Sequence, residues 1–335
     1  MTYLKYYKTL VEKKSSFSNG ESKDFKIDKK NDLDEWLEVC LQNSESNHPT
    51  RFIYRGVSEA KYKLYTSAQR LWIINNFNNC ANKSYLDFII DIVNKAKMKP
   101  LIKKVFNLYG YNNAKRELPI LSILQHYGAP TALMDWTYNK YVACYFATNN
   151  LVIKEAQKYE TDDYFSVYSI DRSNYKKEFM SNIDYWGSRP LKIEDLKKMT
   201  DDSADKENFI FYFSDFESLK VSNLNNVESK KKRCLNTKNP ITTIFNQNII
   251  AQEGLFIFNP YSNKPLEEMF HTDNSTDGYS LVLTPFECHN INKGLAEYLR
   301  RKIDLKYNVN KDFVYPEVYK LTKNIADKAI DSLII

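Results

Sequence analysis

Three short stretches, far apart along the chain, carry the side chains whose types could do chemistry. The first ends in Arg55, the second contains His126 and Asp135, and the third is Gln252-Glu253. A guanidinium binds phosphate through paired hydrogen bonds, whereas a histidine or a carboxylate can move a proton or stabilise developing positive charge. A lone histidine is more often a hydrogen-bonded structural residue than a catalyst, but beside Gln125 and Tyr127 the two roles of His126 are more evenly balanced. Together these residues predict a site for a phosphate-bearing ligand and leave its conversion open.

Arg55 and Asp135 admit two interpretations. A guanidinium at the end of an apolar strand needs an anionic partner, and Asp135 is one within the chain. A buried ion pair between them would be structural. In the alternative, Arg55 binds a pyrophosphate while Tyr127 or Trp136 stacks on a base or a nicotinamide ring.

Two predicted elements position the first and second stretches. Residues 51–56, RFIYRG, predict a strand that delivers Arg55 at its end and leaves Gly56 free to turn sharply. Apolar residues after Pro119 predict a helix that Gly128 terminates, which places His126 and Tyr127 at its end.

Thr137 is suited to cap a further helix over about 139–155, in which Ala143 and Ala147 permit close approach by another backbone. Elsewhere, alternating apolar residues predict strands at 164–170, 209–213, 255–258 and 281–283. Apolar residues at helical spacing predict helices near 32–47, 85–100, 192–199, 295–303 and 318–329. Regular alternation of strand and helix is missing, so the pattern favours an α+β fold with a mostly antiparallel sheet flanked by helices.

The same pattern predicts one large unit. Residues 1–30 form an N-terminal segment that is partly loop, and linker-like chemistry at 13–24 suggests a mobile stretch there. Residues 31–335 form a single domain, with a helical C-terminal portion from about 288.

Composition excludes several classes of protein. An apolar content of 43% with 14% aromatic residues is that of a globular chain and not of a disordered one. The net charge of +6 is too small to predict nucleic-acid binding, and the basic run 230–233 is more typical of a solvated loop. Five widely spaced cysteines form no C-x-x-C pair, and the four histidines lack ligand spacing, which argues against zinc. No segment approaches the roughly 20 apolar residues of a membrane span, so a cytoplasmic location is expected.

Longer patterns around these stretches resemble the FRG domain, a bacterial family named for a Phe-Arg-Gly stretch. The matching segments are Tyr54-Arg55-Gly56 followed by Leu64, Ser67 and Arg70; Gln125-His126-Tyr127-Gly128-Ala129-Pro130-Thr131 continuing through Asp135-Trp136-Thr137 to Phe146-Ala147; and Gln252-Glu253-Gly254-Leu255-Phe256. The family's phenylalanine is Tyr54 here. The resemblance spans roughly residues 30–320.

A secondary resemblance concerns arginine-type ADP-ribosyltransferases, which would make the chain an NAD-consuming enzyme with a fold like theirs. It implies that Arg55 holds NAD phosphate or ribose and that Thr137 supports the strand beside nicotinamide. It further implies that Glu253 stabilises the positive charge at the ribose and orients the acceptor. Gln252, which occupies the position that the FRG pattern emphasises, and His126 are further candidates for catalysis. Asp135-Trp136-Thr137 stands where those enzymes carry a Ser/Thr-rich motif. If strand alternation turns Glu253 away from the cleft of Gln252, this catalytic role fails.

A second class of function remains open from the residues alone. The abundance of tyrosine (25) and phenylalanine (19) also suits a non-catalytic module that binds a nucleotide or nucleic acid in a bacterial defence or toxin system. In the enzymatic interpretation, a protein or a nucleic acid would be the acceptor. The sequence does not decide the acceptor or the oligomeric state.

Overall fold

The structure, a computed structural model of the chain, describes residues 4–44, 52–80, 82–108, 117–149, 151, 158–171, 193–194, 211–213, 247–269 and 286–317. The strands are β1 (Lys26–Ile27), β2 (Phe52–Val57), β3 (Leu133–Thr137), β4 (Tyr164–Asp171), β5 (Phe211–Phe213), β6 (Gly254–Phe258) and β7 (Phe286–Asn292). The α-helices are α1 (Leu10–Lys14), α2 (Lys30–Ser44), α3 (Ser67–Ile74), α4 (Phe77–Cys80), α5 (Tyr85–Met98), α6 (Pro100–Leu108), α7 (Glu117–His126), α8 (Lys140–Asn149), α13 (Gln247–Ala251), α14 (Ala296–Tyr307) and α15 (Lys311–Val314). Short 3-10 turns are η1 (Lys23–Phe25), η2 (Glu160–Asp163), η4 (Leu266–Met269) and η5 (Lys293–Leu295). None of the helices in these ranges has the length and apolar character needed to cross a membrane.

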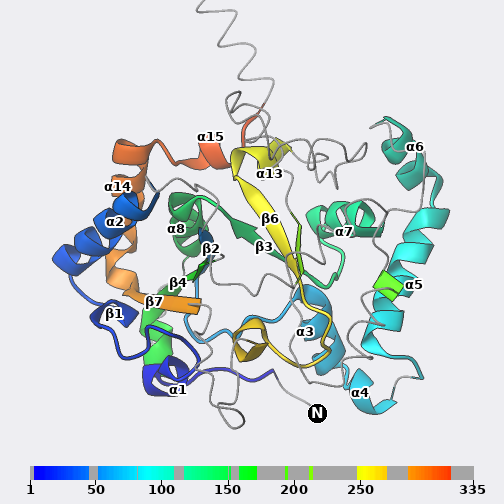
Figure 1. Cartoon of the computed structure of the whole chain (residues 1–335), viewed down its shortest axis with the longest axis horizontal. Helices are drawn as coiled ribbons and strands as arrows, with labels where there is room; N and C mark the ends of the chain where they lie inside the picture. Colours follow the sequence, from blue (N-terminus) through cyan, green and yellow to red (C-terminus); the bar gives the residue numbers. More distant parts are fainter. Residues whose placement is uncertain are drawn as a thin grey trace, which may run out of the picture.

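The strands form one sheet in the order β1-β7-β4-β2-β3-β6-β5. Only the β1–β7 pair is parallel among the described strand pairs, and the other pairs are antiparallel. Helices flank the sheet, with α2 and α14 on the left of Figure 1 and α5 and α6 on the right. The predicted α+β class with a mostly antiparallel sheet is confirmed.

Alternation located four strands correctly and missed three. It found β2, β4, β5 and β6. It missed β7 because polar residues in that strand, such as His289 and Asn290, are buried and hydrogen-bonded instead of facing water. The expected strand at 281–283 and helix at 318–329 lie outside the described residues, as does most of the helix expected at 192–199. The assignment of 31–335 to a single domain stays a prediction.

The sheet opens between β2 and β3. β2 pairs with β4 along six positions, from Phe52 to Val57, and β3 pairs with β6 along five. β2 and β3 pair at a single position among the described residues, where Tyr54 lies opposite Thr137. Strands joined at one position diverge on either side of it, so the backbone groups and side chains that follow are available to other partners.

Gly56 allows α8 to lie directly on β2. A Cβ atom at this position would stand 1.8 Å from the carbonyl oxygen of Ala143 and 2.7 Å from the backbone nitrogen of Ala147. The close approach expected at Ala143 and Ala147 is therefore confirmed. The expected sharp turn at Gly56 is wrong, because the strand runs on to Val57 and Gly56 pairs with Val167.

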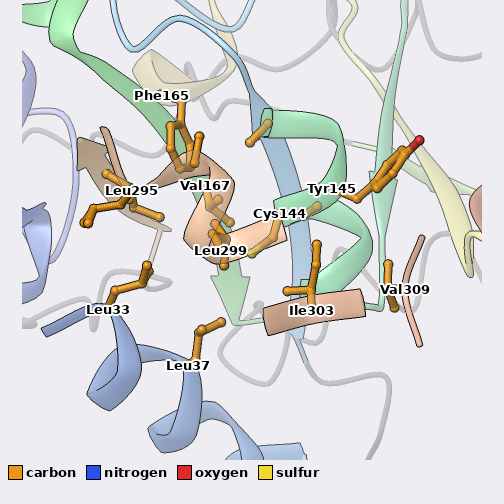
Figure 2. Packing of buried hydrophobic residues seen from close by; sticks show 14 of the residues in the cluster. Leu33, Leu37, Cys144, Tyr145, Phe165, Val167, Leu295, Leu299, Ile303 and Val309 are labelled. Atoms are coloured by element: carbon orange, nitrogen blue, oxygen red, sulfur yellow. The ribbon is translucent and has the colours of Figure 1, made fainter. Parts of the chain in front are cut away.

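Two apolar clusters cover one face of the sheet, one on each side of the opening. In the first, α2, α8 and α14 pack on β4 and β7, as Figure 2 shows for Leu37, Cys144, Leu299 and Val167. In the second, α3, α5 and α7 pack on β3 and β6. Both halves of the sheet are thus held by their own helices, which leaves room for a site between them.

The N-terminal segment covers the opposite face of the sheet. Lys13 of α1 is wholly buried, and its Nζ donates to the carbonyl oxygen of Ala60, to Ser166 Oγ and to Asn290 Oδ1, each at 2.8 Å. Burial lowers the pKa of Lys13. The turns over 15–22 agree with a loop in the stretch 13–24, and the buried Lys13 holds the start of that stretch against the sheet. A lysine that finds three acceptors on distant segments leaves no signal in the local sequence.

Candidate functional site

A cavity of about 910 Å³ lies where β2 and β3 part. This volume is near the upper end of the roughly 300–1,000 Å³ typical of ligand pockets. Six sequence-predicted residues line it, namely Arg55, His126, Asp135, Trp136, Thr137 and Gln252. The predicted convergence of three distant stretches on one cleft is therefore found for these residues. Tyr127 and Glu253 do not belong to the described lining.

Arg55 enters the cavity from β2 without an ionic partner. Its Nη1 donates to the backbone carbonyl oxygen of Asp135, not to the carboxylate, and its buried Nε has no hydrogen-bond partner among the described residues. Among the described residues, no carboxylate oxygen lies within 4.0 Å of a guanidinium nitrogen of Arg55, the limit for a salt bridge. Burial lowers the pKa of Arg55, the charge of Asp135 offsets part of this effect, and the positive charge of Arg70 adds to it. The structural ion pair with Asp135 does not form among the described contacts, and the charge of Asp135 compensates that of the guanidinium only in part.

A chain of hydrogen bonds fixes the carboxylate of Asp135. Gln125 Nε2 donates to Asp135 Oδ2 at 3.0 Å, and Thr131 Oγ1 donates to Gln125 Oε1. Gly128 makes this geometry possible, because its φ of +80° ends α7 and returns the chain toward β3. The Asp135 side chain itself is exposed. The long Gln-to-Asp motif therefore presents an oriented acidic group at the cavity.

Arg70 is a second cation of the cavity that sequence reasoning did not assign to the site. It projects from α3, and its Nη1 donates to the carbonyl oxygen of Tyr65 at 2.9 Å. Burial lowers its pKa, while the hydroxyls of Tyr6 and Tyr62 act in the opposite direction. Among the described residues it forms no ion pair. Its place in the Leu-x-x-Ser-x-x-Arg pattern was the available signal, but the pattern alone does not show which way the side chain points.

The side chains of Thr137 and Gln252 form hydrogen bonds to the backbone, which connect the segments around the cavity. Thr137 Oγ1 donates to the carbonyl oxygen of Gln252 at 2.6 Å and accepts from the backbone nitrogen of Asn139 at 2.9 Å. Gln252 Nε2 donates to the carbonyl oxygen of Val314 at 3.0 Å, which ties α15 to the turn before β6. Thr137 does not cap α8 as expected, because Asn139 Oδ1 accepts from the helix nitrogens of Tyr141 and Val142.

Glu253 lies on a turn, not on a strand. The sequence places Gln252-Glu253 at the start of a strand, but β6 begins at Gly254 and Glu253 has a left-handed φ of +50°. Its carboxylate Oε1 accepts from Asn139 Nδ2 at 3.4 Å. Strand alternation therefore does not govern its direction. Its contact leads toward the start of α8.

The aromatic candidates divide between the cavity and the surface. Trp136 is buried in the core and lines the cavity with part of its ring, and its Nε1 has no partner among the described residues. Tyr127 is 81% exposed and packs edge-on against His126, with ring centroids 4.9 Å apart. His126 is exposed and reaches the cavity. Of the two predicted stacking rings, Trp136 is thus the one at the cavity.

The charge balance of the cavity is positive. Its described lining holds four cationic side chains and one carboxylate, which are Lys5, Arg55, Lys63, Arg70 and Asp135. Lys63 is neutralised by Glu268 at 2.7 Å. Aromatic rings provide much of the remaining wall. In the part of the chain that the structure describes, no group of three or more His, Cys, Asp or Glu side chains is placed to hold a metal ion.

Comparison with known proteins places the chain by family alone. Residues 50–156 match the family model of the FRG domain, and this range contains β2, β3, α7 and α8 with Arg55, Arg70, His126 and Asp135. Searches of curated proteins and of solved structures found no match. The cavity is therefore built largely from the segment that matches the FRG domain, and the chain contains such a domain over residues 50–156.

Proposed function

We propose that the chain binds a nucleotide in the cavity between β2 and β3, with a phosphate on Arg55. The observation that carries this proposal is the half-buried guanidinium of Arg55, whose Nε is buried without a hydrogen-bond partner and which has no carboxylate in contact among the described residues. An uncompensated buried cation is costly, and an anionic ligand that completes its hydrogen bonds recovers that cost.

The rest of the wall suits the other parts of a nucleotide. The exposed rings of Tyr6 and Tyr62 offer surfaces for a base, since every base has a π-face. The oriented carboxylate of Asp135 is suited to accept hydrogen bonds from the hydroxyls of a ribose. Phosphate, ribose and base thus each have a matching group.

Isothermal titration calorimetry with ADP-ribose, NAD and adenosine tests the proposal. We expect both phosphate-bearing ligands to bind and adenosine to bind far more weakly. Arg55→Met should weaken ADP-ribose binding by about 10- to 150-fold, since hydrogen bonds to charged groups contribute roughly 1.5–3 kcal/mol. Arg301→Met is the matched control, because Arg301 is 75% exposed and pairs with Glu297 on α14. Equal binding of ADP-ribose by Arg55→Met and the wild type would contradict the proposal.

The second candidate function is conversion of NAD, as in ADP-ribosyltransferases or NAD glycohydrolases, and the exposed, oriented carboxylate of Asp135 favours it. In that reaction the bond between ribose C1′ and the nicotinamide nitrogen breaks, and nicotinamide leaves with the electron pair. Water or an acceptor group then bonds to C1′ and releases a proton. Positive charge develops at the ribose, so a carboxylate beside it lowers the barrier.

Release of nicotinamide from NAD tests this candidate, first in water and then with protein or nucleic acid as acceptor. Asp135→Asn should slow release by about 100- to 1,000-fold, the effect of losing one electrostatic stabiliser. Glu253→Gln should leave it nearly unchanged. The reverse pattern would make Glu253 the working carboxylate, as the resemblance to the transferases implies. If the wild type binds NAD but releases no nicotinamide with any acceptor, the chain is a binding module.

As a binding module, the chain would report a nucleotide signal to another component of a bacterial defence or toxin system. A cytoplasmic setting suits this role, and the described cysteines Cys144 and Cys288 are buried free thiols.

A further inference from the structure

Two pairs of aromatic rings line the cavity, and they belong to different parts of the chain. Tyr6 contacts Tyr62 with ring centroids 5.8 Å apart, and Phe146 contacts Tyr315 with centroids 6.3 Å apart. Three of these rings are accessible, with 46% of Tyr6, 41% of Tyr62 and 38% of Tyr315 exposed. Large aromatic side chains at that exposure offer faces on which a flat ligand can stack.

The two pairs lie apart in the molecule. The N-terminal segment that carries Tyr6 runs along the bottom of the view in Figure 1, whereas α15, which Tyr315 follows, lies at the top. The β2–β3 opening, where Arg55 lies, falls between these two levels of the view. The two aromatic pairs of the cavity lining therefore draw on segments that lie far apart in this view.

The Tyr6–Tyr62 pair is held in place by the backbone. Tyr6 forms an antiparallel bridge with Tyr62, and the backbone nitrogen of Tyr7 donates to the carbonyl oxygen of Lys61 at 3.0 Å. The anchored Lys13 follows on α1. This part of the cavity lining is thus organised before any ligand arrives, which lowers the entropic cost of binding there.

Two cations serve the same cavity. Arg55 and Arg70 lie close enough that the charge of Arg70 lowers the pKa of Arg55, and no described carboxylate pairs with either. A diphosphate carries two negative charges on adjacent groups and matches such a pair better than a single monoester does.

We propose that the Tyr6–Tyr62 pair and the Phe146–Tyr315 pair are two ring subsites, and that the ligand is a dinucleotide whose diphosphate lies on Arg55 and Arg70. This inference rests on the proposed nucleotide-binding function and specifies its ligand class. Of the four rings, only Phe146 belongs to one of the three sequence motifs.

Calorimetry with two ligands of matched charge tests the inference. Diadenosine diphosphate and ADP-ribose share a diphosphate between two riboses, but only the first carries a second base. We expect the wild type to bind diadenosine diphosphate about 5- to 150-fold more tightly, since stacking of one base on an aromatic side chain contributes on the order of that factor. Tyr62→Ala should abolish the advantage, and so should Tyr315→Ala. Tyr62→Phe and Tyr315→Phe, which keep the rings, should preserve it.

The outcomes separate the inference from the function beneath it. If diadenosine diphosphate and ADP-ribose bind equally to the wild type, or if both alanine variants keep the ratio, the ring subsites are wrong while nucleotide binding stands. Arg55→Met should weaken both ligands by the same factor and leave their ratio unchanged. If the wild type binds neither ligand, the proposed function fails and the inference fails with it. Thermal unfolding of each variant checks that it is folded, which the exposure of the tyrosines leads us to expect.

Discussion

Replacing the half-buried Arg55 with methionine should scarcely change the stability of the fold. The substitution removes one hydrogen bond from a charged donor to the carbonyl oxygen of Asp135, a loss of roughly 1.5–3 kcal/mol. It also removes a cation whose pKa is lowered by burial and by Arg70. A base with a folded-state pKa below its unfolded value destabilises the fold at every pH below that folded-state pKa, so this removal is favourable at neutral pH. The two contributions oppose each other, and we expect the free energy of unfolding to change by about 1 kcal/mol or less.

Urea denaturation of the wild type, Arg55→Met, Asp135→Asn and the double variant measures both the net change and the coupling between the two residues. Breaking a buried ion pair by removing one partner costs about 3–5 kcal/mol. A loss of that size in Arg55→Met, with a comparable coupling energy to Asp135, would refute the view that Arg55 lacks an ionic partner. A small change accompanied by loss of ADP-ribose binding is the result we expect.

Three further substitutions test the surrounding structure, each by denaturant or thermal unfolding. Gly56→Ala should destabilise the fold by about 3 kcal/mol or more, because its Cβ would stand 1.8 Å from the carbonyl oxygen of Ala143; a neutral effect would mean that α8 does not lie on β2 as described. Lys13→Met takes the donor away from the carbonyl oxygen of Ala60, whereas Ser166 Oγ and Asn290 Oδ1 keep their hydrogen bond to each other, so we expect a loss of roughly 1–3 kcal/mol. In the wild type, stability should rise as the pH increases from the lowered pKa of Lys13 toward its ordinary value of 10.5, and a rise that persists in Lys13→Met would show that another group causes it. Glu253→Gly should stabilise the fold by up to about 1 kcal/mol, since φ is +50° there, and a loss of stability would indicate that the carboxylate contact with Asn139 matters more.

The class of fold and most of its regular elements could be predicted from the sequence, because their apolar residues are regularly spaced. β4 and β6 are buried along their whole length, and α5 carries a clear apolar stripe with a capping box at Ser84. β7 escaped prediction because buried asparagine and histidine side chains interrupt its pattern. The spacing of apolar residues does not detect polar side chains that are buried and hydrogen-bonded inside the protein.

The residues of the site were easier to predict than their roles. Three motifs led to Arg55, His126, Asp135 and Gln252 at one cavity. Whether Arg55 contacts the carboxylate or the carbonyl oxygen of Asp135 depends on where β2 and β3 part. That divergence is a property of sheet register, which no short motif encodes. The direction of Glu253 was unpredictable for a similar reason, since a left-handed turn replaces the strand from which its direction was inferred.

The sequence gives almost no indication that Tyr6, Tyr62 and Arg70 line the cavity. Tyr6 and Tyr62 come together through an isolated bridge between segments more than fifty residues apart, and nothing local distinguishes these tyrosines from the other tyrosines of the chain. Arg70 was visible within a motif, but only its proximity to Arg55 gives it a function. Long-range contacts of this kind are decided by the folded topology.

A crystal structure with bound ADP-ribose tests the central claim most directly. We expect a phosphate oxygen within about 3 Å of the Arg55 guanidinium, in the cavity between β2 and β3, with the adenine on an aromatic pair. Two results would contradict phosphate binding by Arg55. One is ADP-ribose bound elsewhere, and the other is Arg55 paired with the carboxylate of Asp135 in a cavity without ligand.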